Sequence, residues 1–303
     1  MTKSTERHAS VLFQEAIDFL GVRASGTYVD CTLGLAGHAE GIVRRLGPDG
    51  HLIGFDRDPE ALNLAKMRLA RVINELGNEA PRITLLPEAF SSIAKHVQPG
   101  SLDGMLADFG VSSLQLDEAR RGFSFQADGP LDMRMDTRSG PTAEQVVNEA
   151  DERELADLIY EYGEERRSRR IARALVRGRP ITTTGQLARI VRSAAPPSKQ
   201  DRIHPATRTF QALRIFVNRE LDEIRALFEA APMLLKPSAR LVVISFHSLE
   251  DRIAKDSFRE GAQKGVWEIL TRKPVTAAEE EIARNPRSRS AKLRAGERTA
   301  SSF

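Results

Sequence analysis

Glycines and acidic residues follow short apolar runs near the start of this 303-residue chain. Residues 27–38 read TYVDCTLGLAGH, and the apolar run at 51–55 ends just before Asp56. Glycines after a buried strand let backbone N–H groups and a helix N-terminus approach a ligand closely. An acid after the next strand can accept hydrogen bonds from ribose hydroxyls. These residues predict a site for a nucleoside-containing cofactor, with Gly34 and Gly37 in the turn and Asp56 at the ribose.

The type of cofactor follows from the glycine spacing and from Asp30. The dinucleotide pattern G-x-G-x-x-G is absent, because Leu35 and Ala36 leave a single glycine pair, so a pyrophosphate is not the expected ligand. Asp30 would place a carboxylate beside the turn, which suits the ammonium and sulfonium groups of S-adenosylmethionine. We therefore expect methyl transfer. The alternative is that the glycines only turn the chain and that Asp56 only caps the next helix.

The amino-acid composition says more about where the protein works than about the reaction it catalyses. With 41% hydrophobic and 29% charged residues, the chain is typical of a globular protein. Cys31 is the only cysteine, and the six histidines show no HExxH or CxxC pairing, so we expect no disulfide, no metal site and a cytoplasmic location. The N-terminus lacks an apolar signal segment, and the apolar run at 241–249 is too short to span a bilayer, so no membrane role is expected.

Basic residues gather at the C-terminus, although the net charge is only +3. Within residues 284–303 the basic residues are Arg284, Arg287, Arg289, Lys292, Arg294 and Arg298, against Glu297 alone. A concentrated basic segment of this kind is what binding to a phosphate backbone requires, which favours a nucleic acid as partner. The alternative is a solvated, unstructured tail.

A second basic run follows an acidic segment in the middle of the chain. Its members are Arg166, Arg167, Arg169, Arg170, Arg173, Arg177 and Arg179, after Asp157, Glu161, Glu164 and Glu165. Acids early and bases late in one helix complement the helix dipole and form i, i+4 pairs. A solvated helix therefore explains most of this run without RNA.

Alternating apolar runs and helical patterns predict a parallel α/β sheet in the first third of the chain. After the two strands above, further strands are expected at 82–86 and 102–107, with helices near 58–77 and 90–97. The fourth strand ends at Asp108, at the carboxyl edge where open α/β sheets bind ligands. Substrate is expected to meet cofactor there.

Helical patterns then replace the strands until about residue 218. Helices are expected at 141–150, 155–176 and 184–194, followed by a helix at 207–231, a strand at 240–246, a helix near 251–260 and a β-rich segment at 266–271. We expect a Rossmann-like methyltransferase domain formed by residues 1–115 and 219–303, the latter with a basic C-terminal tail, and an inserted all-helical substrate-recognition domain at 116–218. The insert could close over the bound base and exclude water.

Seven longer strings are more specific than any of these patterns. They are DFGVSSLQ at 108–115, RGFSF at 121–125, GPLDMRMD at 129–136, HPATRTFQALR at 204–214, VNRE at 217–220, FHSLEDR at 246–252 and NPRSRSAKLR at 285–294. In this order they resemble the ribosomal RNA small subunit methyltransferase H family, also called MraW, from about residue 8 to 298. The resemblance implies a Rossmann-like, S-adenosylmethionine-dependent enzyme that methylates N4 of a cytidine in the decoding region of small-subunit ribosomal RNA, at position 1402 of the 16S RNA.

The resemblance also assigns the cofactor contacts. They fall on Ala36, Gly37, His38, Asp56, Phe90, Asp108 and Gln115. Phe90 could stack on adenine, or it could be ordinary core packing. This chain departs from the family at Ala36, which is usually Gly, and at Phe109, which is usually Leu. An alanine is tolerable at position 36 only if its φ is negative or its methyl group points away from the ligand.

Methylation of cytosine N4 needs a group that accepts the developing positive charge. The lone pair of N4 is delocalised into the ring, so the enzyme must orient the amino group and relieve its charge. Asp108 is our candidate acceptor, although it could instead contact the cofactor. Ser112, Ser113 and His247 are secondary candidates for holding the base or moving the proton. His247 could equally cap the helix that begins at Ser248.

Two other functions remain open from the sequence. A nicotinamide-dependent oxidoreductase would share the α/β unit but should carry the full glycine fingerprint. A non-catalytic RNA-binding ribosome-assembly factor would keep the basic segments without a complete cofactor pocket. The expected partner is small-subunit ribosomal RNA, within a 30S subunit or a late assembly intermediate, and a homodimer is left open.

Overall fold

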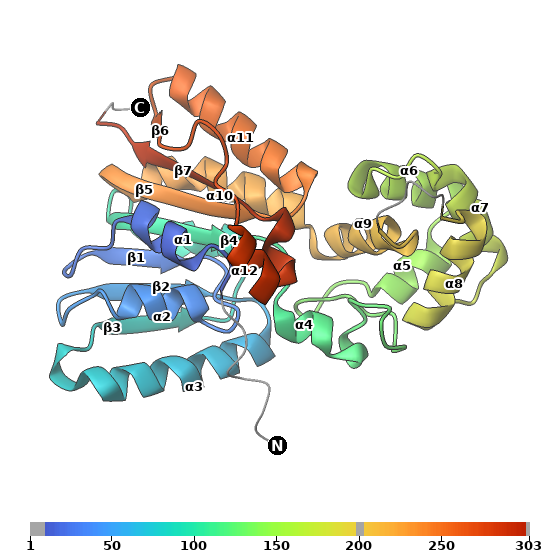
Figure 1. Ribbon diagram of the computed structural model, residues 1–303, viewed down its shortest axis with the longest axis horizontal. Coiled ribbons are helices and arrows are strands. Elements are labelled where there is room, and N and C mark those ends of the chain that lie inside the picture. The colour runs from blue at the N-terminus through green and yellow to red at the C-terminus, as the bar shows by residue number, and fades with distance from the viewer. Residues whose placement is uncertain (1–9, 198–202, 301–303) are drawn as a thin grey trace. The chain divides into compact units, whose positions relative to one another are not determined.

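The computed structural model describes residues 10–197 and 203–300 and divides the chain into two compact units. The first unit comprises Met1–Gly110 and Leu221–Phe303, and the second is Val111–Glu220. Figure 1 shows that the first unit contains the sheet and that the second contains only helices and connecting segments. Within the described residues, no helix is long and apolar enough to cross a bilayer.

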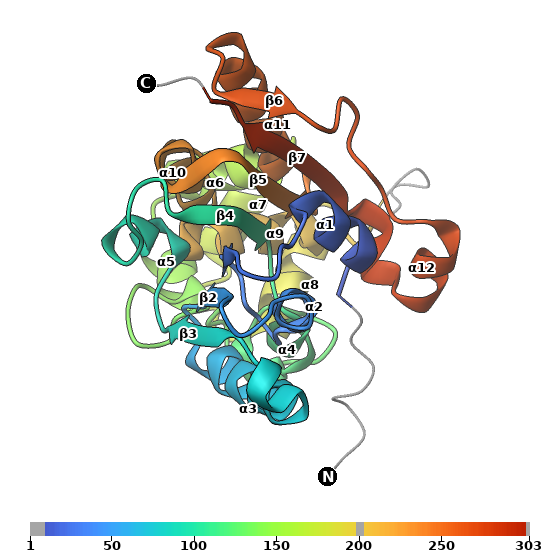
Figure 2. The same cartoon turned by 90° about the vertical axis from the view of Figure 1, so that its left-hand side faces the viewer.

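The first unit is a seven-stranded sheet with helices on both faces. Its elements before the second unit are α1 (Phe13–Leu20), β1 (Thr27–Asp30), α2 (Gly37–Val43), β2 (His51–Phe55), α3 (Pro59–Leu76), η1 (Gly77–Glu79), β3 (Arg82–Leu86), η2 (Phe90–Lys95) and β4 (Leu102–Asp108). Those after it are α10 (Glu220–Leu234), β5 (Leu235–Ser245), α11 (Ser248–Gln263), β6 (Trp267–Ile269), α12 (Glu279–Arg284), η4 (Pro286–Ser290) and β7 (Lys292–Arg298). Figure 2 shows α1 and α2 on one side of the sheet and α10 on the other.

The strand order is β3-β2-β1-β4-β5-β7-β6. Strands β1 to β5 pair in parallel, while β7 runs antiparallel between β5 and β6. β4 is buried along its whole length except at Asp108, as expected for a parallel strand covered on both faces. This Rossmann-like α/β sheet confirms the predicted fold class, and the strands expected at 51–55, 82–86 and 102–107 are present.

In the C-terminal basic segment, residues 292–298 form strand β7 of this sheet and residues 286–290 form η4, so the alternative of an unstructured tail is wrong for these residues. Lys292 and Arg294 in β7 form ion pairs with Asp251 of α11, at 3.0 and 2.7 Å. Arg298 is buried and donates to the Pro232 carbonyl at 3.0 Å. The basic side chains of β7 therefore have partners within the first unit. Five of the seven residues of β7 are buried, Arg294 and Arg298 among them, which the count of charges in the sequence did not reveal.

The second unit is a cluster of helices. Its elements are α4 (Ser113–Asp117), η3 (Ala119–Arg121), α5 (Ala143–Glu149), α6 (Glu152–Gly163), α7 (Ser168–Arg177), α8 (Thr184–Ala194) and α9 (Ala206–Asn218). Capping boxes start α5, α6 and α8, so the N-termini of these helices are encoded locally. Their apolar faces form a single buried core around Ile159, Ile171 and Leu213.

Two helices expected to be continuous are broken, so the predictions for 155–176 and 207–231 are wrong. Glu164 has φ +50° between α6 and α7, and Arg219 has φ +50° between α9 and α10. A residue in the left-handed conformation ends a helix because the following chain turns away from the axis. Apolar spacing continues on each side of these residues, so periodicity could not reveal the breaks. The helix expected near 90–97 is the short 3₁₀ helix η2.

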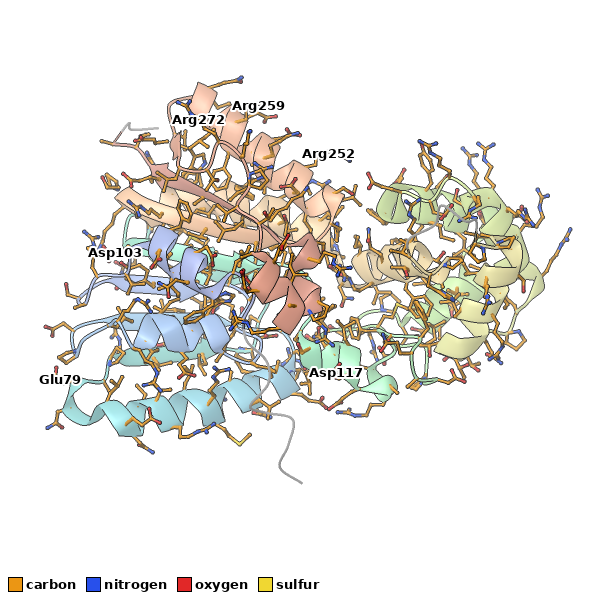
Figure 3. All side chains as sticks on the ribbon, in the orientation of Figure 1. Glu79, Asp103, Asp117, Arg252, Arg259 and Arg272 are labelled. Atoms are coloured by element: carbon orange, nitrogen blue, oxygen red, sulfur yellow. The ribbon has the colours of Figure 1, made fainter. Side chains whose placement is uncertain are left out.

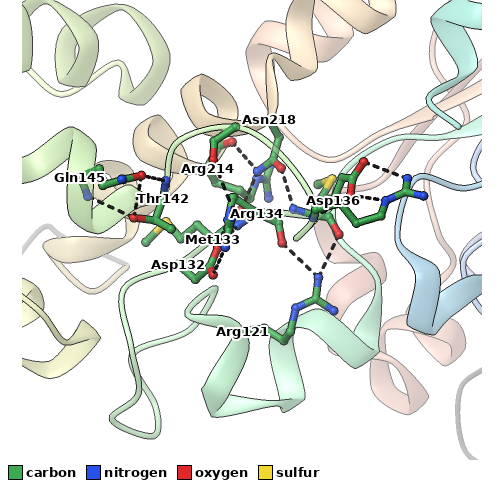
Figure 4. Close-up of polar contacts among 12 residues, drawn as sticks. Arg121, Asp132, Met133, Arg134, Asp136, Thr142, Gln145, Arg214 and Asn218 are labelled. Carbon is green, nitrogen blue, oxygen red and sulfur yellow. Dashed lines mark hydrogen bonds and ion pairs between the residues drawn. The ribbon is translucent and has the colours of Figure 1, made fainter.

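The GPLDMRMD string is held by polar contacts within the second unit (Figure 4). Asn218 donates to the Met133 carbonyl at 2.7 Å and accepts from the Met135 amide at 2.8 Å. Arg121 donates to the carbonyls of Arg134 and Met135 at 3.0 and 3.1 Å. These side chains satisfy backbone groups that no regular element pairs, which gives this irregular segment a defined shape.

Truncating a buried residue of β7 should test its place in the sheet. Leu293 is fully buried, so we expect Leu293→Ala to lower the free energy of unfolding by about 2–5 kcal/mol. Arg289→Ala, at an exposed position in η4, is the control and should change it by less than about 0.5 kcal/mol. Urea unfolding of both variants measures the difference. Equal stabilities would show that this segment is a tail after all.

Candidate active site

The carboxyl ends of β1, β2 and β4 are tied together by hydrogen bonds beyond the strands themselves. The Cys31 amide donates to the Leu106 carbonyl at 2.8 Å, and the Leu33 amide donates to the Phe55 carbonyl at 2.9 Å. The Asp108 amide donates to Thr32 Oγ1 at 2.6 Å. These bonds hold the ends of three strands together at one edge of the sheet. β1 ends at Asp30, β4 ends at Asp108, and Asp56 directly follows β2.

The turn after β1 approaches this edge through residues with positive φ. Gly34 has φ +50°, and its amide donates to Asp56 Oδ2 at 2.7 Å. Ala36 has φ +59°, so of the two conditions expected to make an alanine tolerable here the negative φ is not met and a methyl group that points away from the ligand remains; an alanine in this region costs about 1–2 kcal/mol. The Ala36 side chain is fully buried in the core, where it gains packing. Gly37 starts α2, and a Cβ at Gly37 would lie 1.9 Å from Ser10 Oγ.

Three carboxyl groups with raised pKa values converge at this edge. Burial raises the pKa of Asp30 to about 7, and the charge of Asp56 contributes. Burial likewise raises the pKa of Asp56 to about 6, although its oxygens accept from the amides of Gly34 and Asp58. The pKa of Asp108 is raised well above its usual value by burial and then by the charges of Asp30 and Glu250. Ionisation of all three groups is therefore costly without a cation.

Asp108 contains a buried oxygen that has no hydrogen-bond partner among the described residues. This atom is Oδ1, although a quarter of the side chain is exposed. The other oxygen, Oδ2, lies 3.7 Å from Nδ1 of His38. His38 Nε2 lies 3.1 Å from the Val11 carbonyl, so Nε2 carries the proton and Nδ1 presents its lone pair. Burial lowers the pKa of His38 to about 4, so its ring is neutral at pH 7 and brings Asp108 no charge.

Asp103 lies near the other end of β4 and is a buried acid with cationic partners, in contrast to Asp108. Its carboxylate pairs with Arg23 and with Lys236 Nζ, the latter at 2.7 Å, and it accepts from the Thr27 amide at 2.8 Å. Burial alone would raise the pKa of Asp103, but these partners leave it lowered. Figure 3 shows Asp103 at the amino edge of the sheet. Asp108 lacks such partners, and this contrast marks the carboxyl edge as a site for a cationic ligand.

Two aromatic residues follow the carboxyl ends of β3 and β4. Phe90 begins η2, after β3, and Phe109 directly follows β4. Their ring centres are 6.5 Å apart with a tilt of 34°. Phe109 is buried, whereas Phe90 is partly exposed and keeps surface on which a planar ligand could stack.

Ser112, Ser113 and Gln115 belong to the second unit, where they begin α4. The Gln115 amide donates to Ser112 Oγ at 3.3 Å, and Gln115 Oε1 accepts from the Ser112 amide at 3.0 Å. This reciprocal capping box accounts for the burial of Gln115. The hydroxyl of Ser112 thus has a structural partner, and nothing in this geometry singles out Ser113.

His247 caps α11, which is one of the two roles anticipated for it. Its side chain accepts from the Glu250 amide at 3.5 Å, while the Glu250 carboxylate accepts from the amides of Phe246 and His247 at 2.7 and 3.2 Å. Glu250 is fully buried and its charge acts on Asp108. Sequence reasoning missed Glu250 as part of this site. Its position five residues after the end of β5, within the FHSLEDR string, was the available signal.

Comparison with known proteins identifies the family. The model of the MraW methylase family matches residues 5–299. The chain belongs to the MraW methylase family. Its relatives include proteins named ribosomal RNA small subunit methyltransferase H from Acidobacterium capsulatum, 68% identical over 97% of this chain and 99% of the relative, and from Koribacter versatilis, 62% identical over 96% and 94%. A solved SAM-dependent methyltransferase from Aquifex aeolicus aligns over 98% of this chain and 94% of its own with 9% identity and a TM-score of 0.42, too distant to bear on function.

Family membership confirms that this chain is a methyltransferase with S-adenosylmethionine as its methyl donor. The acidic edge agrees with that cofactor, because the sulfonium and ammonium groups supply positive charge near Asp30 and Asp108, on whose pKa values no described cation acts.

The raised pKa of Asp30 should make stability fall as pH rises. The folded state still binds the proton between about pH 4 and 7, whereas the unfolded chain has lost it, so the unfolding free energy decreases with pH in that window. Asp30→Asn keeps the acceptor for the Thr32 amide and removes this loss. We expect the variant to gain roughly 3 kcal/mol over wild type between pH 5 and pH 8.

Urea unfolding of the ligand-free proteins at both pH values measures this gain. Asp49→Asn, in an exposed turn, is the matched control. A difference between Asp30→Asn and wild type that does not change with pH would contradict the prediction.

The capping role of His247 predicts a mild effect of asparagine. Asn is among the best N-cap residues, so His247→Asn should change the unfolding free energy by less than about 1 kcal/mol, while His247→Ala should cost about 0.5–2 kcal/mol. Turnover of His247→Asn should stay within a few-fold of wild type. A loss of about two orders of magnitude in a stable His247→Asn protein would instead assign the imidazole a chemical role.

Proposed function

We propose that this protein transfers a methyl group from S-adenosylmethionine to the exocyclic N4 of a cytidine in the decoding region of small-subunit ribosomal RNA. The observation that carries the chemistry is the unpartnered, buried Oδ1 of Asp108 at the acidic carboxyl edge. The RNA substrate is supported by the names of the 68% and 62% identical relatives. The target at position 1402 of the 16S RNA, N4 and not another atom, comes from the resemblance of the sequence strings.

In this proposal the first unit binds the cofactor. The carboxyl groups of Asp30 and Asp108 suit its positive groups, and the amides of the Ala36–Gly37–His38 turn suit its methionine part. Asp56 is assigned to the ribose, because each carboxylate oxygen that already accepts one amide keeps a second lone pair. Phe90 is assigned to the adenine. Gln115 is proposed as a further contact, and its capping bonds would hold its side chain in place.

Bound S-adenosylmethionine supplies an electrophilic methyl group. Asp108 Oδ1 accepts a hydrogen of the cytosine amino group and then the proton that N4 loses once it carries the methyl group. Ionisation of Asp108, costly in the free protein, becomes favourable beside a positive charge. Because His38 is neutral, it does not compensate the negative charge of ionised Asp108, and the carboxylate therefore stays basic. Ser112 and Ser113 are assigned to hold the base, as hydroxyl groups that can hydrogen-bond its edge.

The second unit is proposed to recognise the RNA. A 30S subunit or late assembly intermediate, in the cytoplasm, would offer the cytidine together with its surrounding RNA structure. A flipped base would leave the stack to reach Asp108, as in other enzymes that modify bases.

The decisive experiment is methyl transfer from labelled S-adenosylmethionine to small subunits that lack the modification, with nucleoside mass spectrometry of the product. Wild type should make N4-methylcytidine. Asp108→Asn should keep a cofactor affinity within about tenfold by calorimetry but lose about two orders of magnitude in turnover. Asp49→Asn should match wild type.

Other outcomes would each overturn part of the proposal. Full activity of Asp108→Asn would place the proton acceptor elsewhere. Cofactor binding without product on subunits or naked RNA would favour a non-catalytic assembly factor. Methylation at an atom other than N4 would leave the enzyme class intact and refute the specificity.

A further inference from the structure

Helix α7 has a basic face, and most of its arginines form no ion pair with acidic side chains among the described residues. At 3.6 residues per turn, its four arginines fall within an arc of about 100°, opposite its buried residues. The arginines are Arg169, Arg170, Arg173 and Arg177, and the buried residues are Ser168, Ile171, Ala172 and Leu175. The exposed Arg166 precedes the helix. These five arginines are named here the α7 basic face.

The structure removes the simplest explanation for these charges. One helix over 155–176 would have placed acids before bases, in i, i+4 pairs along its length. The break at Glu164 instead leaves α7 with no acid in its first turn and with Arg169 and Arg170 there, next to the positive end of the helix dipole. Arginines at i, i+4, such as Arg169 and Arg173, also repel each other. The sequence of α7 is therefore unfavourable for an isolated solvated helix.

Two of the acids that precede α7 form ion pairs outside the α7 basic face. Asp157 lies 3.8 Å from Arg153 on its own helix, and the buried Glu165 pairs with Arg167 at 3.2 Å. Among the described residues, Arg173 alone of the α7 basic face has an ion pair, with Glu152 at 3.2 Å. In the part of the chain that the structure describes, Arg166, Arg169, Arg170 and Arg177 make no hydrogen bond or ion pair.

Other arginines of the same run show the contrast. Arg179 donates to the carbonyls of Val147 and Ala150, and Arg167 donates to the Pro196 carbonyl at 3.0 Å. These two stabilise the fold. The neighbouring helix α8, which packs against α7, adds the exposed Arg189 and Arg192, also without contacts among the described residues (Figure 1).

We propose that the α7 basic face binds the phosphate backbone of the RNA substrate. This deepens the proposed function and rests on it for the identity of the RNA. Successive i, i+4 positions rise by about 6 Å, so Arg169, Arg173 and Arg177 form a row along which a strand can place several phosphates. Guanidinium groups bind phosphate oxygens in pairs of hydrogen bonds. Such contacts hold the RNA in register and carry no base specificity.

The test removes three unpartnered charges and leaves the ion-paired Arg173 intact. The variant is Arg169→Gln, Arg170→Gln and Arg177→Gln in the full chain. The control removes the same charge from exposed, unpartnered positions of the first unit with Arg71→Gln, Lys264→Gln and Arg272→Gln. Arg272 is labelled in Figure 3. The probe is a transcribed fragment of the 16S decoding region, titrated at several salt concentrations.

We expect the α7 variant to bind the fragment on the order of 10- to 100-fold more weakly and to lower the slope of log affinity against log salt by about 2–3. The control should lower the slope by less than about 1. Affinity for S-adenosylmethionine should stay unchanged in both proteins, and KM for methyl transfer to subunits should rise in the α7 variant while kcat is retained.

The two proposals fail in different ways. If wild type methylates subunits but the α7 variant and the control bind RNA equally well, the α7 basic face is not the phosphate surface and the enzymatic function stands. If the α7 variant alone loses RNA binding while wild type makes no methylated product, the surface stands and the function falls. Loss of binding to protein-containing subunits with unchanged binding to naked RNA would assign the face to an acidic protein and overturn this proposal.

Discussion

Three acids with raised pKa values at one edge of a sheet are the constraint around which the first unit is organised, and on two of them, Asp30 and Asp108, no described basic residue acts. Parallel strands bring Asp30, Asp56 and Asp108 together because their carboxyl ends all meet at that edge. Each carboxyl resists ionisation, and one oxygen of Asp108 is left without a donor. The free energy needed to ionise these carboxyl groups is high in the protein without its cofactor and falls when a cationic cofactor binds. The same electrostatic interactions therefore contribute to the affinity for S-adenosylmethionine and act on the reacting amino group.

Elsewhere the same unit neutralises its acids within the fold. Asp103 pairs with Arg23 and Lys236 at the opposite edge, and Asp251 pairs with Lys292 and Arg294 of β7. Of the basic residues that suggested a nucleic-acid-binding tail, Lys292, Arg294 and Arg298 thus have partners within the first unit, whereas Arg284, Arg287 and Arg289 are exposed outside the sheet. Removing one partner of the Asp251 pairs would leave a half-buried charge. The imbalance at the carboxyl edge is accordingly local, and not a general property of the first unit.

The second unit has the reverse imbalance. A single left-handed residue, Glu164, separates an acidic helix from a basic one, and among the described residues the acidic helix supplies one ion pair to the basic one, from Glu152 to Arg173. What remains on α7 is a row of arginines on the side opposite its apolar contacts. The two units therefore suit different ligands. The positive charge of the helical unit suits an RNA backbone, and the acidic edge of the sheet suits a sulfonium cofactor.

The sequence alone determined the parallel strands of the sheet but not β7, because buried parallel strands are nearly continuous apolar runs and glycines with acids after them are local signals. Asp30, Gly34, Asp56 and Asp108 could be found in this way. Specific strings fixed the family. Tertiary structure decided which charges are neutralised: Arg294 meets Asp251 from 43 residues away, and no local pattern encodes such a pair. It also decided the helix breaks at Glu164 and Arg219 and the positive φ of Ala36, because residues without a glycine signal adopt the left-handed region only when surrounding packing compensates its cost.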